Sequence, residues 1–233
     1  MENPPRKFED KVSIIIPCKI IDQDVLKCVN ACKALPNNVE IFVVDDNDCP
    51  GFPALKRNWA MQRATGDYLA FLDADAYPTE DWLNNAITYL KNGFVGVCGP
   101  GILPPHSPIL EQAADLVFKY LPYNYRVTPK HARIVAEFPT FNLIVRKESA
   151  PKFENYLTGE DSLFCRRIQG FIIYSPLVTV YHRRRPLFIK YWKQIGTYGL
   201  HRGHLIRLAF LGWLSTWFVY GRNFIKGLTR RKI

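Results

Sequence analysis

The sequence predicts an α/β protein in which a central, mostly parallel sheet is flanked by helices. Three observations predict this class. Short apolar runs rich in β-branched residues recur at residues 12–16, 39–44 and 68–72, and such runs are typical of strands buried on both faces. Segments with the 3.6-residue spacing of helices separate these runs. The second and third runs each end in a group of carboxylates, at the strand ends where open α/β sheets bind ligands.

The first part of the chain alternates strands and helices in the order that a doubly wound sheet requires. The run at residues 12–16 stops at Pro17, and Asp22 is placed to cap a helix over residues 25–35. The second run is followed by a helix that we expect over residues 54–64. The Rossmann-like pattern of strand, helix, strand, helix and strand is then complete.

The remainder of the chain is less regular. Thr79 is placed to cap a third helix that ends near Gly93. The apolar stripe of this helix is Leu83, Ala86, Ile87 and Leu90. Beyond it we expect a strand at 94–97, a Pro-rich loop at 100–108, a helix at 109–120, an extended segment at 137–145, a helix at 161–168, and strands at 172–174 and 178–181.

The 233-residue chain has a formal net charge of +10, and this charge is unevenly placed. Residues 162–233 contain 14 of the 31 Lys and Arg side chains and no Asp or Glu. We therefore expect an acidic partner for this end of the chain: nucleic acid, a phosphate-rich ligand or anionic lipid. Residues 1–11 show no export signal, and the six cysteines lack a Cys-x-x-Cys pair or zinc-binding spacing, which favours the cytosol.

Residues 186–233 differ in composition from the rest of the chain, because they interleave Trp, Tyr, Phe and Leu with Lys and Arg. Only fourteen residues separate Arg207 from Arg222, whereas a membrane-spanning helix needs about 20 apolar residues. Basic and aromatic side chains at helical spacing are typical of helices that lie in the membrane interface. The segment therefore predicts a C-terminal amphipathic helical extension and a peripheral or monotopic protein.

Asp73 and Asp75 directly follow the apolar run at residues 68–72. Because side chains alternate along a strand, we expect both carboxylates on the same side of the sheet. Two close carboxylates repel each other unless a cation lies between them, and Mg²⁺ and Mn²⁺ prefer hard oxygen ligands. The pair therefore indicates a divalent-metal site for a phosphate-bearing ligand. The alternative is that Asp75 only caps a turn before Pro78.

Five short motifs occur in a defined order along the chain. They are Val12-Ser13-Ile14-Ile15-Ile16-Pro17, then Val43-Val44-Asp45-Asp46-Asn47, then Lys56-Arg57-Asn58 ahead of Gly66-Asp67-Tyr68 and Asp73-Ala74-Asp75, then Phe141-Asn142 followed by Gly159-Glu160-Asp161, and finally His182 followed by Arg183-Arg184-Arg185. In this order the chain resembles the inverting family 2 glycosyltransferases of the GT-A fold over about residues 11–200. The resemblance implies a catalytic domain at residues 1–185, with a nucleotide-sugar half at about 11–100 and an acceptor half at about 101–185, before the membrane-interface segment at 186–233.

The resemblance also implies the parts of a donor site. The donor is a nucleotide sugar, for which we expect a UDP-sugar, and the cofactor is Mn²⁺ or Mg²⁺ bound by Asp73, Asp75 and His182. Such a cation neutralises the charge that grows on a diphosphate leaving group. The other expected donor contacts are Pro17 against the nucleotide base, Asp45 or Asp46 paired with that base, and Arg57 at the diphosphate or base.

The acceptor site implied by the resemblance centres on Asp161, the general base that takes the proton of the acceptor hydroxyl. Glu160 orients the acceptor or Asp161. The further acceptor contacts are Asn142, Arg183, Arg184 and Arg185, and the arginines can hold phosphate groups. The expected function is metal-dependent, inverting transfer of a sugar to a hydroxyl of a lipid-linked or other glycan acceptor, at the cytosolic face of a membrane.

Each motif also has a plainer explanation. Asp45 can cap a turn, Glu160 and Asp161 can be first-turn acids favoured by the helix dipole, and His182 can be a packed side chain. Polyprenyl-phosphate glycosylation is an alternative reaction, in which a phosphate acceptor needs no base. A basic nucleic-acid-binding module is disfavoured, because the basic residues lie in a Trp- and Leu-rich tail without a nucleic-acid motif.

Overall fold

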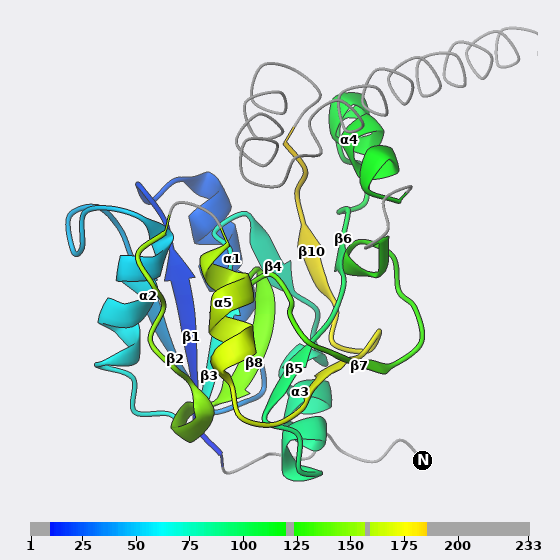
Figure 1. Cartoon of the computed structure of the whole chain (residues 1–233). Coiled ribbons are helices and arrows are strands. Elements are labelled where there is room, and N and C mark those ends of the chain that lie inside the picture. Colours follow the sequence, from blue (N-terminus) through cyan, green and yellow to red (C-terminus); the bar gives the residue numbers. More distant parts are fainter. Residues whose placement is uncertain (1–9, 120–123, 157–158, 186–233) are drawn as a thin grey trace, which may run out of the picture. The chain divides into compact units, whose positions relative to one another are not determined.

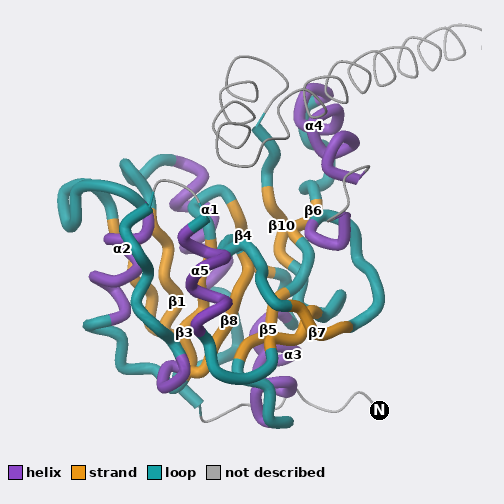
Figure 2. Tube along the Cα trace, in the orientation of Figure 1, coloured by secondary structure: helices purple, strands orange, loops and turns teal. Residues whose placement is uncertain are grey.

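The structure, a computed structural model, describes residues 10–119, 124–156 and 159–185. Figure 1 shows strands flanked by helices, and Figure 2 distinguishes the two by colour. The predicted α/β class is confirmed. The predicted helical extension at residues 186–233 lies outside the described residues.

The chain divides into two compact units. The first consists of residues 1–102 and 129–182, and the second of residues 103–128 and 183–233. The sequence analysis placed one boundary at residue 185 and did not foresee that residues 103–128 separate from the first unit. All of the strands in the described part of the chain belong to the first unit.

Seven strands form the larger sheet, in the order β2-β1-β3-β8-β5-β9-β7. Their bounds are β1 Val12–Pro17, β2 Val39–Val44, β3 Tyr68–Leu72, β5 Gly96–Cys98, β7 Arg133–Val135, β8 Asn142–Arg146 and β9 Ile172–Tyr174. β2, β1, β3, β5 and β9 run in one direction, whereas β8 and β7 run against them. β1 and β3 are buried along their whole length, which explains their uninterrupted apolar sequences.

Three short strands form a second sheet in the order β4-β10-β6. Their bounds are β4 Ala76–Pro78, β6 Gly101–Ile102 and β10 Val180–His182. The antiparallel register of β4 and β10 places His182 opposite Ala76. This pairing brings a late segment of the chain to the end of β3, because β4 begins four residues after Leu72.

Three helices of the first unit follow the predicted order. They are α1 Gln23–Lys33, α2 Pro53–Met61 and α3 Trp82–Lys91. The Asp22 side chain accepts hydrogen bonds from two backbone amides of α1, so the predicted cap is confirmed. The predicted Thr79 cap is wrong: α3 starts after Asp81, and the Thr79 hydroxyl instead donates to the Thr179 carbonyl at 2.9 Å.

Helices cover both faces of the larger sheet. α5 (Glu160–Arg167) packs through Phe164 on Phe71 of β3. α3 approaches the other face, because Trp82 donates a 2.8 Å hydrogen bond to Asn142, which pairs with Leu72, the neighbour of Phe71. A short 3-10 turn, η2 (Lys147–Ser149), follows β8.

The second unit contains α4 (Ile109–Lys119) and a 3-10 turn, η1 (Asn124–Arg126). Glu111 and Asp115 lie on the buried side of α4 and pair with Arg183 and Arg184. A buried carboxylate is stable only when its charge is matched, so these pairs attach the segment after β10 to α4. Within the described ranges, no helix combines the length and apolar character that a membrane span requires.

Candidate active site

Three side chains that can bind a metal converge at the end of β3. The His182 Nε2 atom lies 3.3 Å from Asp75 Oδ1 and 4.0 Å from Asp73 Oδ2. One ligand atom from each residue can be chosen so that all three lie within 4.8 Å of one another. The predicted grouping of Asp73, Asp75 and His182 is therefore present in the fold, while their binding of a metal stays a prediction.

The two carboxylates lie together for a reason other than strand alternation. β3 ends at Leu72, and residues 73–75 form a turn that is closed by a 3.0 Å hydrogen bond from the Ala76 amide to the Asp73 carbonyl. β4 then begins at Ala76 and pairs with β10, which supplies His182. The turn and the small sheet, rather than the strand itself, position the group.

Arg57 of α2 connects this group to the start of α5. The side chain is buried, and its Nη2 atom lies 3.5 Å from Asp73 Oδ1, while its Nη1 atom lies 3.3 Å from Glu160 Oε1. The guanidinium plane also lies over the ring of Phe153, 5.4 Å from its centroid. Arg57 is thus held from three sides, and the sequence did not predict its contact with Glu160.

The site contains more negative than positive charge. Desolvation raises the pKa of Asp73; Arg57 and His182 oppose this rise, and the carboxylates of Asp75 and Asp161 add to it. Desolvation likewise raises the pKa of Glu160, with a further rise from Asp161 that Arg57 opposes. Arg57 therefore does not neutralise the cluster, and an additional cation would be favourable there.

Asp161 lies in the first turn of α5, beside Glu160. Gly159 precedes the helix with a φ of 85°, a left-handed conformation that glycine adopts without strain. The Asp161 carboxylate is half-buried and accepts a 2.8 Å hydrogen bond from the Ser162 amide. Its position agrees with both earlier explanations, a general base and a first-turn acid, so the catalytic role stays a prediction.

The loop after β2 is preorganised by its own polar groups. Asp45 is buried and accepts hydrogen bonds from the Asn47 and Asp48 amides at 2.8 and 3.2 Å, so the turn-capping alternative describes its geometry. These bonds lower the pKa of Asp45. Asp46 is half-exposed and forms an ion pair with Lys56. Contact of Asp45, Asp46 or the buried Pro17 with a nucleotide base stays a prediction.

Lys56 is a functional candidate that the sequence analysis missed. Its side chain is 2% exposed, and its ammonium donates to Asp46 and, at 2.8 Å, to the Gly51 carbonyl. The ammonium therefore ties both ends of the loop at residues 46–51 to α2. The position of Lys56 could have indicated this, because it lies with Ala54, Arg57 and Ala60 on the buried side of α2.

Two acceptor-site predictions need correction. Asn142 is fully buried; its amide donates to the Gly99 and Val178 carbonyls at 2.9 and 2.7 Å, and its carbonyl accepts from Trp82. Both amide protons are used within the fold and the side chain is fully buried, so it cannot reach an acceptor.

Arg184 is likewise buried, and its Nε donates to Asp115 at 3.0 Å, so it holds the second unit together. Arg183 pairs with Glu111 but keeps a partly exposed side chain, and Arg185 is exposed. The buried ion pair of Arg184 contradicts its predicted acceptor contact, whereas acceptor contact by the partly exposed Arg183 stays a prediction. Acceptor contact by Arg185 stays a prediction.

The residues at the end of β3 suit a divalent cation. Two carboxylates and one imidazole are ligands that Mn²⁺ accepts, and the carboxylates alone suit Mg²⁺. Burial raises the pKa of Asp73, and the carboxylates of Asp75 and Asp161 add to that rise; a bound cation would offset both effects.

The comparisons with known proteins agree with this geometry. The family described as Glycosyl transferase family 2 matches residues 52–152, which confirms the predicted resemblance over that range. A search of curated proteins found no match.

Two solved structures share the fold. The mannosyltransferase PcManGT from Pyrobaculum calidifontis, solved with GDP-Man and Mn2+, aligns with a TM-score of 0.56 and 16% identity, over 81% of this chain and 60% of that protein. The protein A197 from STIV aligns with a TM-score of 0.50 and 14% identity, over 74% of this chain and 85% of that protein. The chain thus spans about 60% of the length of the mannosyltransferase.

Proposed function

We infer that this chain is a family 2 glycosyltransferase with a GT-A fold, because the family match, the fold and the ordered motifs agree. We propose that it transfers a sugar from a nucleotide-sugar donor to an acceptor hydroxyl, with inversion at the anomeric carbon and with the help of a divalent cation. The observation that carries the proposal is the convergence of Asp73, Asp75 and His182 next to the ion pairs of Arg57.

The donor side of the reaction uses the residues at the end of β3. Asp73, Asp75 and His182 would hold the cation, which when bound supplies positive charge to the diphosphate leaving group. Arg57 holds one oxygen of Asp73 and so fixes the orientation of that carboxylate. Lys56 keeps the loop at residues 46–51 in place for the nucleotide.

The acceptor side of the reaction centres on the start of α5. The acceptor oxygen forms a bond to the anomeric carbon while the bond between that carbon and the diphosphate oxygen breaks. Asp161 takes the proton that the hydroxyl loses. Arg57 Nη1 lies 3.3 Å from Glu160 Oε1, and this ion pair restrains the first turn of α5, which also carries Asp161.

The identities of the donor and acceptor are further parts of the proposal. We expect a UDP-sugar from the motifs, whereas the mannosyltransferase of the same fold was solved with GDP-Man, so GDP-mannose is the alternative donor. The acceptor is a lipid-linked or other glycan precursor at the cytosolic face of a membrane. The basic, aromatic composition of residues 186–233 supports this location.

The test is a panel of UDP- and GDP-sugars with the full chain, measured as metal-dependent donor turnover and as a rise in melting temperature. Binding to the folded state raises the melting temperature, so one donor with Mn²⁺ should raise it more than the others. We expect Asp75→Asn to reduce turnover strongly without loss of the fold, because Asp75 is a half-exposed turn residue.

Asp81→Asn is a matched control, because Asp81 is exposed and makes no side-chain cap bond at the start of α3. This variant should retain turnover. Full turnover by the unmodified chain in excess EDTA would show that no divalent metal takes part.

A further inference from the structure

Phe141 stacks on His182, the candidate metal ligand from β10. The two ring centroids are 4.7 Å apart, and the ring planes differ by 25°. Phe141 is only 8% exposed, and it lies directly before β8, whose first residue pairs with Leu72. The aromatic ring is therefore placed beside the turn that carries Asp73 and Asp75.

The neighbours of Phe141 hold the ring in this position. Asn142, the next residue, has its side-chain amide bonded to the Gly99 and Val178 carbonyls, so the backbone at this point is fixed from two sides. Phe138 supports the ring from a centroid distance of 5.5 Å and is itself buried. A ring that cannot rotate away restricts the imidazole that it covers.

Gly101 of β6 leaves the space that both rings occupy. A Cβ atom at this position would lie 2.7 Å from Cε2 of Phe141 and 2.9 Å from Cβ of His182. Both distances are shorter than van der Waals contact, so any side chain at residue 101 would displace one ring or the other. The absence of a side chain is thus part of the geometry around His182.

We propose that Phe141 and Gly101 form a seat that fixes the direction of His182 and thereby gives the cation site its preference for Mn²⁺ over Mg²⁺. This inference rests on the proposed function, because it assumes a cation at Asp73, Asp75 and His182. Mg²⁺ sites are built from oxygen ligands, whereas an imidazole nitrogen favours a transition-metal ion. Without the seat, His182 can rotate away from the cation. The two carboxylates that remain offer only oxygen ligands, which do not favour Mn²⁺ over Mg²⁺ as an imidazole nitrogen does.

The test is the affinity of the full chain for MnCl₂ and MgCl₂, measured separately by calorimetry in the presence of UDP and of GDP. For Phe141→Leu we expect the Mn²⁺ affinity to fall about tenfold, a loss typical when the partner of a metal ligand is removed, while the Mg²⁺ affinity changes less than about threefold. Phe141→Tyr keeps the ring and should retain the preference. Gly101→Ala should lose it as Phe141→Leu does.

Phe164→Leu is the matched control. Phe164 is as deeply buried as Phe141 and stacks on Phe153 at 4.0 Å, but it lies on α5 and is not one of the three candidate ligands. Its loss should leave the ratio of the two affinities unchanged. Equal losses of Mn²⁺ and Mg²⁺ affinity in Phe141→Leu, or an unchanged ratio in both Phe141→Leu and Gly101→Ala, would overturn the seat.

The unmodified chain separates this inference from the function on which it rests. If the unmodified chain binds neither cation, the proposed metal-dependent function is wrong and the seat fails with it. If it prefers Mn²⁺ and the seat variants keep that preference, only the seat is wrong. The melting temperatures of all variants show whether a lost affinity reflects a lost fold. If Phe141→Leu is unfolded, the metal preference of the folded Phe141→Tyr variant tests the seat: a retained preference supports it, and a lost preference contradicts it.

Discussion

At the scale of single residues, the site is organised by one buried arginine. Arg57 touches Asp73 of the candidate metal group and Glu160 next to the candidate base, so the proposed donor and acceptor sides share one guanidinium group. Removal of a buried charge that pairs with two carboxylates leaves both of them uncompensated. The two halves of the proposed reaction are therefore expected to respond together to changes at Arg57, whereas changes at Asp161 should affect mainly the acceptor side.

This separation gives a prediction for Asp161. Removal of a general base typically reduces the rate about 10²- to 10⁴-fold, so Asp161→Asn should lower sugar transfer by that order and leave donor binding nearly intact. Transfer rate and donor affinity should be measured on the same preparation, with Glu148→Gln as the control, because Glu148 is 77% exposed. Transfer at the unmodified rate would mean that the base lies elsewhere or that the acceptor is a phosphate.

Short motifs predicted which residues come together better than they predicted isolated contacts. The motifs group Asp73, Asp75 and His182, and the fold brings these three together, while their role as metal ligands stays a prediction. Asn142 was assigned wrongly because its three partners, Gly99, Val178 and Trp82, come from segments whose approach is a tertiary property. No pattern local to residue 142 distinguishes a buried amide that joins strands from one that faces a ligand.

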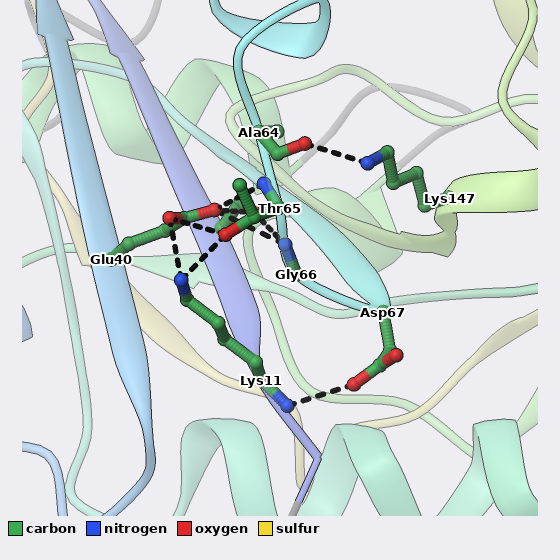
Figure 3. Close-up of polar contacts among 8 residues, drawn as sticks. Lys11, Glu40, Ala64, Thr65, Gly66, Asp67 and Lys147 are labelled. Carbon is green, nitrogen blue, oxygen red and sulfur yellow. Dashed lines mark hydrogen bonds and ion pairs between the residues drawn. The ribbon is translucent and has the colours of Figure 1, made fainter.

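At the scale of the elements, a second polar cluster fastens the opposite end of the sheet. Figure 3 shows Glu40 of β2 against Lys11, Thr65 and Gly66, at the ends where β1 and β3 begin. The Glu40 carboxylate accepts from the Thr65 amide at 2.6 Å and from the Gly66 amide at 3.1 Å, and it pairs with Lys11 at 2.9 Å. Ser13 of β1 also donates to Glu40 at 2.6 Å, so one side chain joins three strands.

Gly66 has to be a glycine for this cluster to form. A Cβ atom there would lie 2.7 Å from the Ser13 hydroxyl and 2.8 Å from the Lys11 carbonyl. The sequence analysis named Gly66 only within the motif Gly66-Asp67-Tyr68 and did not predict the cluster. Hydrophobic patterns do not predict a carboxylate that accepts hydrogen bonds from β1 and from the segment before β3.

The cluster makes the stability of the sheet depend on pH. Burial alone would raise the pKa of Glu40, but the bonds from Lys11, Ser13 and Thr65 outweigh it and lower the pKa from 4.5 to about 2. A pKa below the unfolded value means that the charged group stabilises the fold above about pH 4.5 and that this contribution is lost as the pH falls toward 2. The shift corresponds to at most about 3 kcal/mol of unfolding free energy at pH 7, and screening by solvent reduces this contribution.

We therefore expect Glu40→Gln to unfold at a clearly lower urea concentration than the unmodified chain at pH 7. The difference between the two should shrink between pH 5 and pH 2, as the unmodified carboxyl gains its proton. Urea midpoints at several pH values measure this, with Glu80→Gln as an exposed control. A difference that stays constant over this pH range would mean that the packing of Glu40, and not its charge, stabilises the sheet.

The elements themselves were predicted where their sequences are long and regular. β1, β2, β3 and α3 follow from runs and stripes that only one secondary structure explains. β4, β6 and β7 were not predicted, because short segments without a sustained apolar run become strands only through their pairing with a distant strand. β10 was expected from the run at residues 178–181, but its pairing with β4 was not, and that pairing places His182 opposite Ala76 near the end of β3.

At the scale of the whole molecule, charge is divided between the two units. Glu111 and Asp115 of the second unit are occupied by Arg183 and Arg184. No acidic side chain follows Asp161 in the sequence, so the nine Lys and Arg residues of segment 186–233 have no acid within that segment. The composition alone predicts the uneven distribution of charge. It does not predict that two of the basic residues pair with buried acids of α4, because that pairing depends on the fold.

The charge and aromatic content of residues 186–233 lead to our proposal that the enzyme binds an anionic membrane surface. Each Lys or Arg near such a surface contributes about 1 kcal/mol, so the segment should bind vesicles that contain phosphatidylglycerol more strongly than neutral phosphatidylcholine vesicles. Replacement of Arg230, Arg231 and Lys232 by Ala in the full chain should weaken binding to anionic vesicles by about 3 kcal/mol, or roughly 100-fold, and binding should fall as salt rises. Co-sedimentation at two salt concentrations measures both effects.

The matched control replaces three exposed basic residues of the first unit, Lys33, Lys130 and Lys152, by Ala. It removes the same net charge from the molecule but leaves residues 186–233 intact, so it should bind anionic vesicles nearly as the unmodified chain does. Equal weakening by both triple variants would indicate that overall charge, and not this segment, attracts the protein to lipid. If the unmodified chain stays in the supernatant with both kinds of vesicle, the membrane proposal is wrong, and a soluble glycan acceptor becomes the reading that the remaining site geometry supports.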